Sequence, residues 1–249
     1  MTSSLNGKVV LITGAASGIG RATAVKLSKL GCALALTDVV DEGLGETAES
    51  CHTEKIITAE LDVSNTAQCE LVVKETVEYF GRLDHIFNCA GINPTAYPLL
   101  DLPDGYFDKL VAVNLKGTYN VTKAALPHLK EHSGCSFVNV SSVLGLKPSK
   151  MQATYCATKY AIIGFSKSMA LELGEKGIRV NVVAPGFIHT PTNASVVEGP
   201  DSVKTAEQSV SLGRLGTPAE VADVVAFMMS DEAKYMNGSV VEVNGGLAY

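Results

Sequence analysis

The sequence predicts an α/β protein in which seven mostly parallel strands form a doubly wound sheet with helices on both faces. Short apolar runs rich in β-forming residues alternate with longer amphipathic runs from end to end. Runs such as VVLI and VNVV are almost continuously apolar, which is typical of strands covered on both sides. A glycine-rich turn follows the first run. That turn, together with only seven strand–helix units, argues against an eight-unit barrel.

The first half of the chain supplies four of the strands. Each is a short apolar run, and they are Val9–Ile12, Ala33–Thr37, Lys55–Ala59 and His85–Cys89. Two longer amphipathic runs between them, Ile19–Leu30 and Ala67–Phe80, are expected to be helices. Strands joined through helices imply right-handed crossovers, so neighbouring strands should be parallel.

The second half supplies three more strands, Ser136–Val140, Arg179–Val183 and Ser239–Val243. Three helices are expected between them: Tyr106–His132, Thr154–Leu173 and Ala219–Met229. Pro127 should interrupt the first of these, because proline removes a helical hydrogen bond. The pattern contains no linker, repeat or low-complexity tract, so one domain over residues 1–249 is expected.

Composition narrows the class of protein. With 249 residues and 46% hydrophobic side chains, the chain can bury a sizeable core. The net charge is −6 and the 20 Lys and Arg residues are scattered, which argues against a nucleic-acid-binding surface. The chain starts without an apolar signal segment and has no apolar run of the ~20 residues that cross a bilayer. A soluble cytoplasmic protein without membrane partners is expected.

Neither cysteine nor histidine is spaced as a metal site requires. The six cysteines contain no C-x-x-C pair, so reduced thiols in an intracellular protein are expected. No metal-ligand spacing links the histidines at positions 85, 128, 132 and 189. The sequence therefore predicts no metal.

Tyr155 and Lys159 are the most informative pair in the chain. They lie four residues apart in the helix Thr154–Leu173, which places a phenol and an ammonium on one helical face. A phenol titrates near ~10, and a nearby cation favours its phenolate. With Ser142 as a hydroxyl donor, the pair could transfer a proton to or from an alcohol or carbonyl. A surface tyrosine stacked on a lysine stem would give the same spacing.

The turn after the first strand predicts a dinucleotide site. Between Gly14 and Gly20 the chain reads G-x-x-x-G-x-G, and Ser17, Gly18 and Ile19 complete the turn. Glycines let the backbone approach a pyrophosphate, which the free N–H groups of the following helix then bind. Any tight strand-to-helix turn can also use glycine, so the turn alone is weak evidence.

Asp38 strengthens the prediction and favours NAD over NADP. It closes the second strand, where a carboxylate can accept hydrogen bonds from both ribose hydroxyls. The same charge would repel a 2′-phosphate, and no Arg or Lys occupies the turn at Ala15–Ser17 or closely follows Asp38. An ordinary strand-end turn former remains an alternative for this residue alone.

Taken together and in order, these motifs resemble the short-chain dehydrogenase/reductase family over essentially the whole chain. TGAASGIG resembles the family's cofactor turn, and Asp38 its NAD-selecting acid. The resemblance implies that Asp62 and Val63 hold the adenine. Asn88-Cys89-Ala90-Gly91 is similar to the family's Asn-Asn-Ala-Gly segment, with cysteine in place of the second asparagine. A Rossmann-like fold is implied.

The resemblance also implies the catalytic and nicotinamide-binding residues. Ser142 would hold the substrate oxygen, Tyr155 would transfer the proton, and Lys159 would bind the nicotinamide ribose. Asn114 would bind a water that extends the proton path, through a bend in its own helix. Four further residues resemble the segment that holds the nicotinamide, namely Pro185, Gly186, Ile188 and Thr190.

The segment 187–215 is expected to form a mobile lid over the substrate, because it lies beyond the strand ends where ligands bind. It contains several prolines and glycines and a short predicted helix around Asp201–Val210. Predicted pocket residues, in addition to Ser142, are Val143, Leu144, Gln152, Phe187, Asn93 and Pro94. They are mostly apolar, so a medium-sized apolar secondary alcohol or ketone is the expected substrate.

By analogy with the family, a homotetramer is expected, or else a homodimer. The leading hypothesis is an NAD-dependent oxidoreductase. A 3-oxoacyl-[acyl-carrier-protein] reductase is the alternative within the enzyme class, although Asp38 disfavours NADPH. A cofactor-binding protein with an isomerase or regulatory role is the alternative outside redox chemistry.

Overall fold

Seven parallel strands form a sheet of order β3-β2-β1-β4-β5-β6-β7 in the computed structural model, which describes residues 4–92, 96–191 and 200–247. The strands are β1 (Val9–Thr13), β2 (Ala33–Asp38), β3 (Ile56–Glu60), β4 (His85–Asn88), β5 (Ser136–Val140), β6 (Arg179–Pro185) and β7 (Val240–Val243). All six neighbouring pairs are parallel, so the predicted fold class is confirmed.

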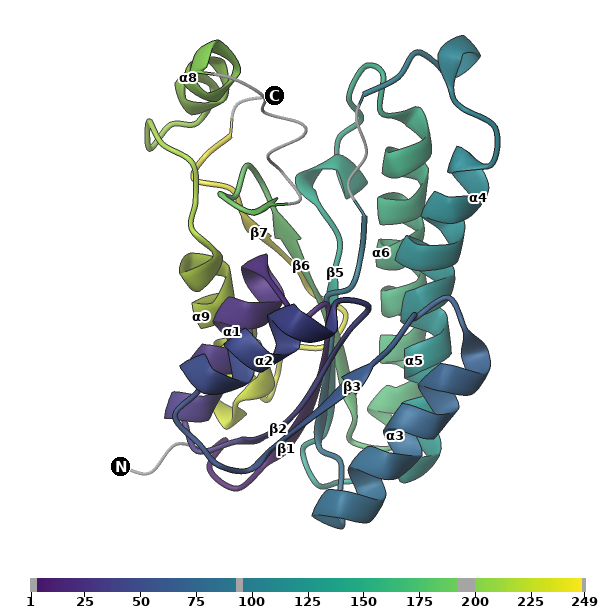
Figure 1. The fold of residues 1–249 in the computed structure, drawn as a ribbon, viewed down its shortest axis with the longest axis vertical. Helices are drawn as coiled ribbons and strands as arrows, with labels where there is room; N and C mark the ends of the chain where they lie inside the picture. The colour runs from purple at the N-terminus through teal and green to yellow at the C-terminus, as the bar shows by residue number, and fades with distance from the viewer. Residues whose placement is uncertain (1–3, 93–95, 192–199, 248–249) are drawn as a thin grey trace.

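Helices cover both faces of the sheet (Figure 1). On one face lie α1 (Gly18–Lys29), α2 (Asp41–Ser50) and α9 (Pro218–Met229). On the other lie α3 (Thr66–Phe80), α5 (Gly117–Ala125) and α6 (Ala153–Gly174). Two further helices, α4 (Tyr106–Leu110) and α8 (Pro200–Ser209), stand near the upper end of the sheet in this view. The result is a three-layer arrangement.

The alternation of side chains along β1 shows why both layers form. Val10 and Ile12 pack in the core on the α1 and α9 side, with Leu27 among their neighbours in that cluster. Val9 and Leu11 face the opposite core, which contains Val121 from α5. Because successive strand residues point to opposite faces, an apolar run without polar interruptions can fill both cores.

The structure differs from the sequence prediction at two helices. The helix α2 was not expected, because its sequence DEGLGETAES contains two glycines that weaken helix propensity. The helix predicted over Tyr106–His132 is wrong in extent: α4 and α5 are separated by a π-helical turn, Val111–Lys116, and a single 3₁₀ turn at Leu126–His128 follows α5. His132 has a left-handed φ of 54°, which a helix cannot include.

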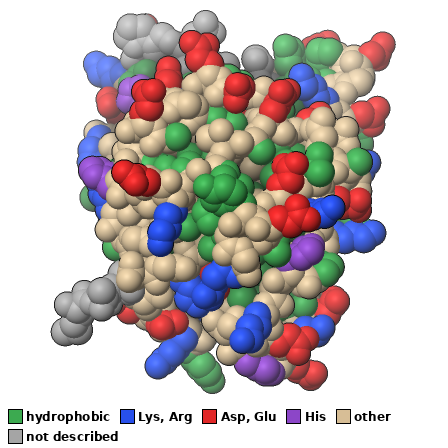
Figure 2. All heavy atoms as spheres, turned by 60° about the horizontal axis from the view of Figure 1, so that its bottom comes forward, with side chains coloured by type: hydrophobic (Ala, Val, Ile, Leu, Met, Phe, Trp, Pro, Cys, Tyr) green, Lys and Arg blue, Asp and Glu red, His purple; other side chains and the backbone are tan. Residues whose placement is uncertain are grey.

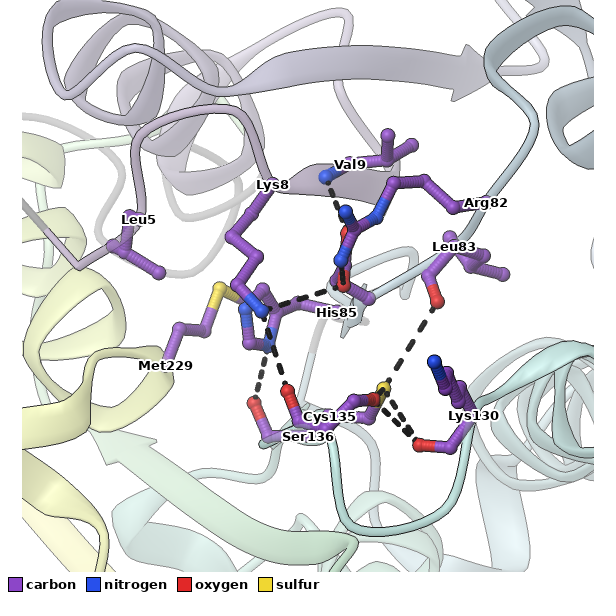
Figure 3. Close-up of polar contacts among 12 residues, drawn as sticks. Leu5, Lys8, Val9, Arg82, Leu83, His85, Lys130, Cys135, Ser136 and Met229 are labelled. Atoms are coloured by element: carbon purple, nitrogen blue, oxygen red, sulfur yellow. Dashed lines mark hydrogen bonds and ion pairs between the residues drawn. The ribbon is translucent and has the colours of Figure 1, made fainter.

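A polar cluster connects the N-terminal ends of β1, β4 and β5 (Figure 3). The buried carboxylate of Asp84 accepts hydrogen bonds from the Val9 amide (2.9 Å) and from the Arg82 guanidinium (2.8 and 2.6 Å). Lys8 Nζ lies 3.5 Å from the same carboxylate. Beside it, His85 Nδ1 lies 2.9 Å from Ser136 Oγ. These bonds join β1, β4 and β5 at the end opposite the helix α8.

The lower face of the molecule carries mixed charge. Figure 2 shows Lys and Arg side chains interspersed with Asp and Glu side chains around a small apolar area. Among the described helices, none is both long and apolar enough to cross a lipid bilayer.

Candidate functional site

A cleft of about 1020 Å³ opens at the carboxyl ends of the strands. Its walls come from residues at or after the ends of β1, β2, β3, β4, β5 and β6, from α6, and from α8. In open parallel sheets this edge is where ligands bind. A volume of this size is sufficient for a dinucleotide together with a small substrate.

The first turn has the backbone geometry that a pyrophosphate requires. Gly14 and Gly18 adopt left-handed φ values of 69° and 52°. A Cβ at Gly14 would lie 2.9 Å from the Ala90 backbone, so only glycine lets the turn approach the end of β4. Ser17 caps α1 by position but its side chain makes no capping hydrogen bond. The first N–H groups of α1 therefore remain able to bind an anion.

Asp38 is held rigidly at the end of β2. Its carboxylate accepts hydrogen bonds from the Ala16 amide (3.0 Å) and the Val40 amide (3.3 Å). The nearby Arg21 guanidinium is occupied by the Ala16 carbonyl, the Gly43 carbonyl and Glu46. The cleft wall at this point thus presents a fixed carboxylate, while the neighbouring cation is already paired.

The predicted adenine residues also line the cleft. The backbone N–H and the hydroxyl of Ser64 both donate to Asp62 Oδ1, at 2.9 and 2.7 Å. Val63 lies beside Asp62, and Ala90 and Gly91 face them from the end of β4.

Asn88 is the one predicted cofactor residue that does not line the cleft. Its Nδ2 donates to Asn139 Oδ1 (2.8 Å) and to Thr122 Oγ1 (3.2 Å), inside the layer between the sheet and the helices. Asn139 in turn donates to Ser166 Oγ (2.9 Å). In the segment that follows β4, the first residue that lines the cleft is Cys89.

Tyr155 and Lys159 project from α6 into the base of the cleft. They are 7% and 5% exposed, and Lys159 Nζ lies 5.6 Å from the centroid of the Tyr155 ring. The ammonium donates one hydrogen bond, to the Val140 carbonyl (3.1 Å). Since an ammonium has three donors, two remain for a ligand. Ser142 lines the same part of the cleft, and its Oγ accepts from the Leu144 amide (3.1 Å).

Burial, rather than Lys159, has the largest effect on the pKa of Tyr155 in this arrangement. Burial raises the pKa of Tyr155 to about 12, and the Ser142 hydroxyl opposes that rise only in part. Burial also lowers the pKa of Lys159 to about 8. The physical reason is that both groups are removed from water, which penalises the charged form of each.

Asn114 lies behind the cleft wall, in the π-helical turn. Its Nδ2 donates to the Ile92 carbonyl (3.0 Å), and its Oδ1 accepts from the Ile92 amide (2.8 Å). The π-helical turn provides the predicted irregularity in this helix. Asn114 therefore fixes the loop after β4, of which Gly91 and Ile92 line the cleft.

Most of the remaining predicted residues line the cleft as well. The nicotinamide segment, namely Pro185, Gly186, Ile188 and Thr190, lines the cleft. Val143, Leu144, Gln152 and Phe187 line it as well. Asn93 and Pro94 lie outside the described residues, as does 192–199 within the predicted lid.

The structure adds residues to the cleft that the sequence did not predict. Besides Cys89, they include polar residues from α4, from the segment before α6 and from α8, namely Lys109, Ser149, Lys150, Asp201, Ser202 and Thr205. The pocket is therefore less apolar than the sequence predicted. The helical period of α8 could have indicated Ser202, Thr205 and Ser209 as one face.

The C-terminal segment contacts the residues that follow α8. Val210, just after α8, pairs with Leu247 in an antiparallel bridge, and Leu247 itself lines the cleft. The amide and hydroxyl of Ser211 both donate to the Gly246 carbonyl, at 3.1 and 2.6 Å. At the other end, the His189 amide donates to the Gly216 carbonyl (2.8 Å). The helix predicted around Asp201–Val210 is present as α8.

The described residues contain no group of three or more metal-ligating side chains placed to hold an ion. The six cysteines are free thiols.

Known proteins resemble this chain along nearly its whole length. A family model described as enoyl-(acyl carrier protein) reductase matches residues 14–248. A 3-oxoacyl-[acyl-carrier-protein] reductase of Thermotoga maritima is 40% identical over 98% of both chains. Levodione reductase of Leifsonia aquatica is 38% identical over 98% of this chain and 96% of its own.

Solved structures show the same similarity. A short-chain dehydrogenase/reductase from Brucella melitensis, titled a glucose/ribitol dehydrogenase, superimposes with a TM-score of 0.93 at 34% identity over all of both chains. A 3-ketoacyl-(acyl-carrier-protein) reductase from the same organism, complexed with NADH, gives a TM-score of 0.92 at 31% identity, covering 98% of this chain and 99% of its own.

Proposed function

The chain belongs to the short-chain dehydrogenase/reductase family of NAD(P)-dependent oxidoreductases, and on that premise we propose that it interconverts a secondary alcohol and a ketone with NAD as its cofactor. One observation carries the proposal. Tyr155 and Lys159 lie buried together, beside Ser142, in the same cleft as the glycine turn and Asp38.

The residues of the cleft fit a dinucleotide. The pyrophosphate would lie against the N-terminus of α1, which leaves its first N–H groups without side-chain caps. The adenine would lie beside Asp62 and Val63, and the nicotinamide beside Pro185, Gly186 and Thr190. The bound nicotinamide supplies the hydride, and the protein supplies orientation and a proton.

Asp38 supports NAD over NADP. Its carboxylate is fixed by two backbone amides at the position proposed for the adenosine ribose. A 2′-phosphate there would meet a negative charge, and Arg21 is already paired with Glu46 and two carbonyls. A solved relative is complexed with NADH, which supports the same preference.

Four side chains of this protein would bind the substrate oxygen, donate the proton and position the cofactor. Ser142 would bind the substrate oxygen and stabilise its developing charge. Tyr155, with its pKa raised to about 12, holds its proton at neutral pH and is poised to donate it to a ketone. The two remaining donors of Lys159 would bind the nicotinamide ribose hydroxyls. Asn114, whose side-chain amide bonds the Ile92 backbone behind the cleft wall, would hold a water that connects Lys159 with solvent through its remaining hydrogen-bonding capacity.

A 3-oxoacyl-[acyl-carrier-protein] reductase is the second candidate, because a relative with that name is 40% identical over 98% of the chain. Turnover of a 3-oxoacyl thioester with NADPH in preference to NADH would favour it. Levodione reductase, at 38% identity, supports a small ketone instead.

The assembly and location remain proposals. Tyr119 on α5 and Tyr160 and Leu171 on α6 are exposed apolar side chains, which supports packing of these helices against copies in a homotetramer. A single domain over 1–249 is supported by one sheet that includes strands from both ends of the chain. A cytoplasmic location is inferred from the sequence alone.

The proposed function is tested with a panel of secondary alcohols and ketones, each assayed with NAD(H) and NADP(H) in the wild type and in Tyr155→Phe. The variant should lose about 100-fold or more in kcat, because it removes the proton donor. Its affinity for NADH, measured by fluorescence titration, should change less than about threefold. Tyr235→Phe, at a fully exposed tyrosine, is the matched control. Undiminished turnover in Tyr155→Phe would remove the assigned role.

A further inference from the structure

Gln152 stands out in the cleft because the oxygen of its side-chain amide is buried without a hydrogen-bond partner among the described residues. The residue is 6% exposed and lines the cleft, yet its Oε1 makes no hydrogen bond to any described residue. It occupies the N-cap position of α6, but its side chain does not cap the helix. A buried amide oxygen left unpaired costs on the order of 1–3 kcal/mol, so a partner is expected from elsewhere.

The backbone holds Gln152 in this position at a local cost. Met151 has a left-handed φ of 64°, a conformation that costs a non-glycine residue about 1 kcal/mol or more. Its side chain is 41% exposed, whereas both of its neighbours, Lys150 and Gln152, line the cleft. The Met151 carbonyl accepts from the Tyr97 amide (3.0 Å), and the Gln152 carbonyl from the Cys156 amide (2.8 Å).

The position of Gln152 in the chain places its side-chain amide near Tyr155. Gln152 precedes Tyr155 by three residues, at the N-cap of the helix that carries Tyr155, and both side chains line the same cleft. A substrate oxygen bound by Tyr155 would therefore lie within a few bonds of any group bound by Gln152. An amide can donate to a carbonyl and accept from a hydroxyl, so it can serve a substrate in either redox state.

From these observations we infer that Gln152 is a specificity-determining residue that binds a second, uncharged oxygen of the substrate, so that the preferred substrates are diols, hydroxyketones or diketones. The inference rests on the proposed function. A carboxylate or phosphate is disfavoured in this place, because an amide carries no charge to neutralise it. The cation nearest in sequence, Lys150, lines the cleft but is exposed to solvent.

The test compares cyclohexanol with cyclohexane-1,2-, 1,3- and 1,4-diol, oxidised by the wild type and by Gln152→Met. Methionine has a similar length but cannot pair with an oxygen. The wild type should prefer at least one diol by about 10-fold or more in kcat/KM. Gln152→Met should lose about 10- to 100-fold on that diol and less than about threefold on cyclohexanol.

Gln208→Met is the matched control, since Gln208 is an exposed residue of α8 that does not line the cleft. NADH titration of both variants verifies that each is folded. The inference is overturned if the wild type prefers no diol, or if Gln152→Met keeps the preference. If no alcohol in the broader panel is oxidised with either cofactor, the proposed oxidoreductase function fails, and this inference fails with it.

Discussion

Lys159 is the residue whose charge state should govern the activity in alkaline solution. Burial lowers its pKa to about 8, well below that of a lysine in water. The ammonium therefore loses its proton as the pH rises through about 8, while the Tyr155 phenol, with a pKa of about 12, is still protonated. Above that pH the phenolate formed during proton donation has no adjacent cation.

We expect kcat/KM for ketone reduction to fall above about pH 8, towards a tenfold loss per pH unit. A profile of kcat/KM measured from pH 6 to 10 tests this decrease. In Lys159→Arg, kcat/KM should be lower at every pH. Its alkaline decrease should begin at a higher pH than in the wild type, because arginine stays charged. A wild-type profile that is flat to pH 9.5 would contradict the assignment.

Single residues also show where sequence reasoning succeeds. Ser142, Tyr155 and Lys159 could be predicted to meet, because a helical spacing and a strand end fix their directions. The orientation of Gln152 depends on the left-handed Met151 before it, which no propensity predicts. Leu247 enters the cleft through pairing with Val210, a contact between segments far apart in the chain.

At the scale of elements, the C-terminal turn is bonded to the segment that follows α8. Gly245 and Gly246 have left-handed φ values of 62° and 74°, and the Gly246 carbonyl binds Ser211 twice. A Cβ at Gly246 would lie 2.9 Å from the Ser211 side chain. The position of α8 therefore depends on residues that have no direct part in the chemistry.

Gly246→Ala should raise the KM for substrate several-fold, because it displaces the segment after α8, and should leave the Kd for NADH within about threefold. Gly213→Ala is the control: Gly213 has a similar φ of 68°, but its added Cβ would meet nothing within 4 Å. Both variants carry the same backbone penalty, so their difference isolates the contact with Ser211. Equal KM values would contradict the proposed support.

The elements that were mispredicted share a cause in tertiary packing. Gly43, in α2, lies against Ala16 so closely that a Cβ would meet its side chain at 2.7 Å. A glycine that weakens the helix in isolation is thus required by the contact. The π-helical turn likewise positions Asn114 against Ile92, and periodicity indicated the helix but not its length.

At the scale of the whole molecule, the buried end of the sheet should make stability depend on pH. His85 is 1% exposed, and burial lowers its pKa to about 3. Between that value and about 6.5, the unfolded chain binds a proton that the folded chain does not, so stability falls as the pH falls. Asp84, whose pKa is held below its usual range by Arg82, the Val9 amide and Lys8, acts in the same direction at lower pH.

From pH 6 to 4.5, urea unfolding of the wild type should lose up to about 1.4 kcal/mol per pH unit more than that of His85→Asn. The asparagine does not titrate, although it should lower stability at every pH by removing buried volume. His128→Asn, at an exposed histidine, should keep the wild-type slope. Parallel curves for wild type and His85→Asn would show that His85 does not carry this dependence.

The opposite placement of the two chain ends has a practical consequence (Figure 1). Leu247 forms part of the cleft wall, so a purification handle or surface linker attached to the chain shortly after Leu247 would begin close to the cleft. Attachment through the N-terminal end, beside the starts of the strands, leaves that opening free. Immobilised enzyme for assays or biosensors should be anchored from that side.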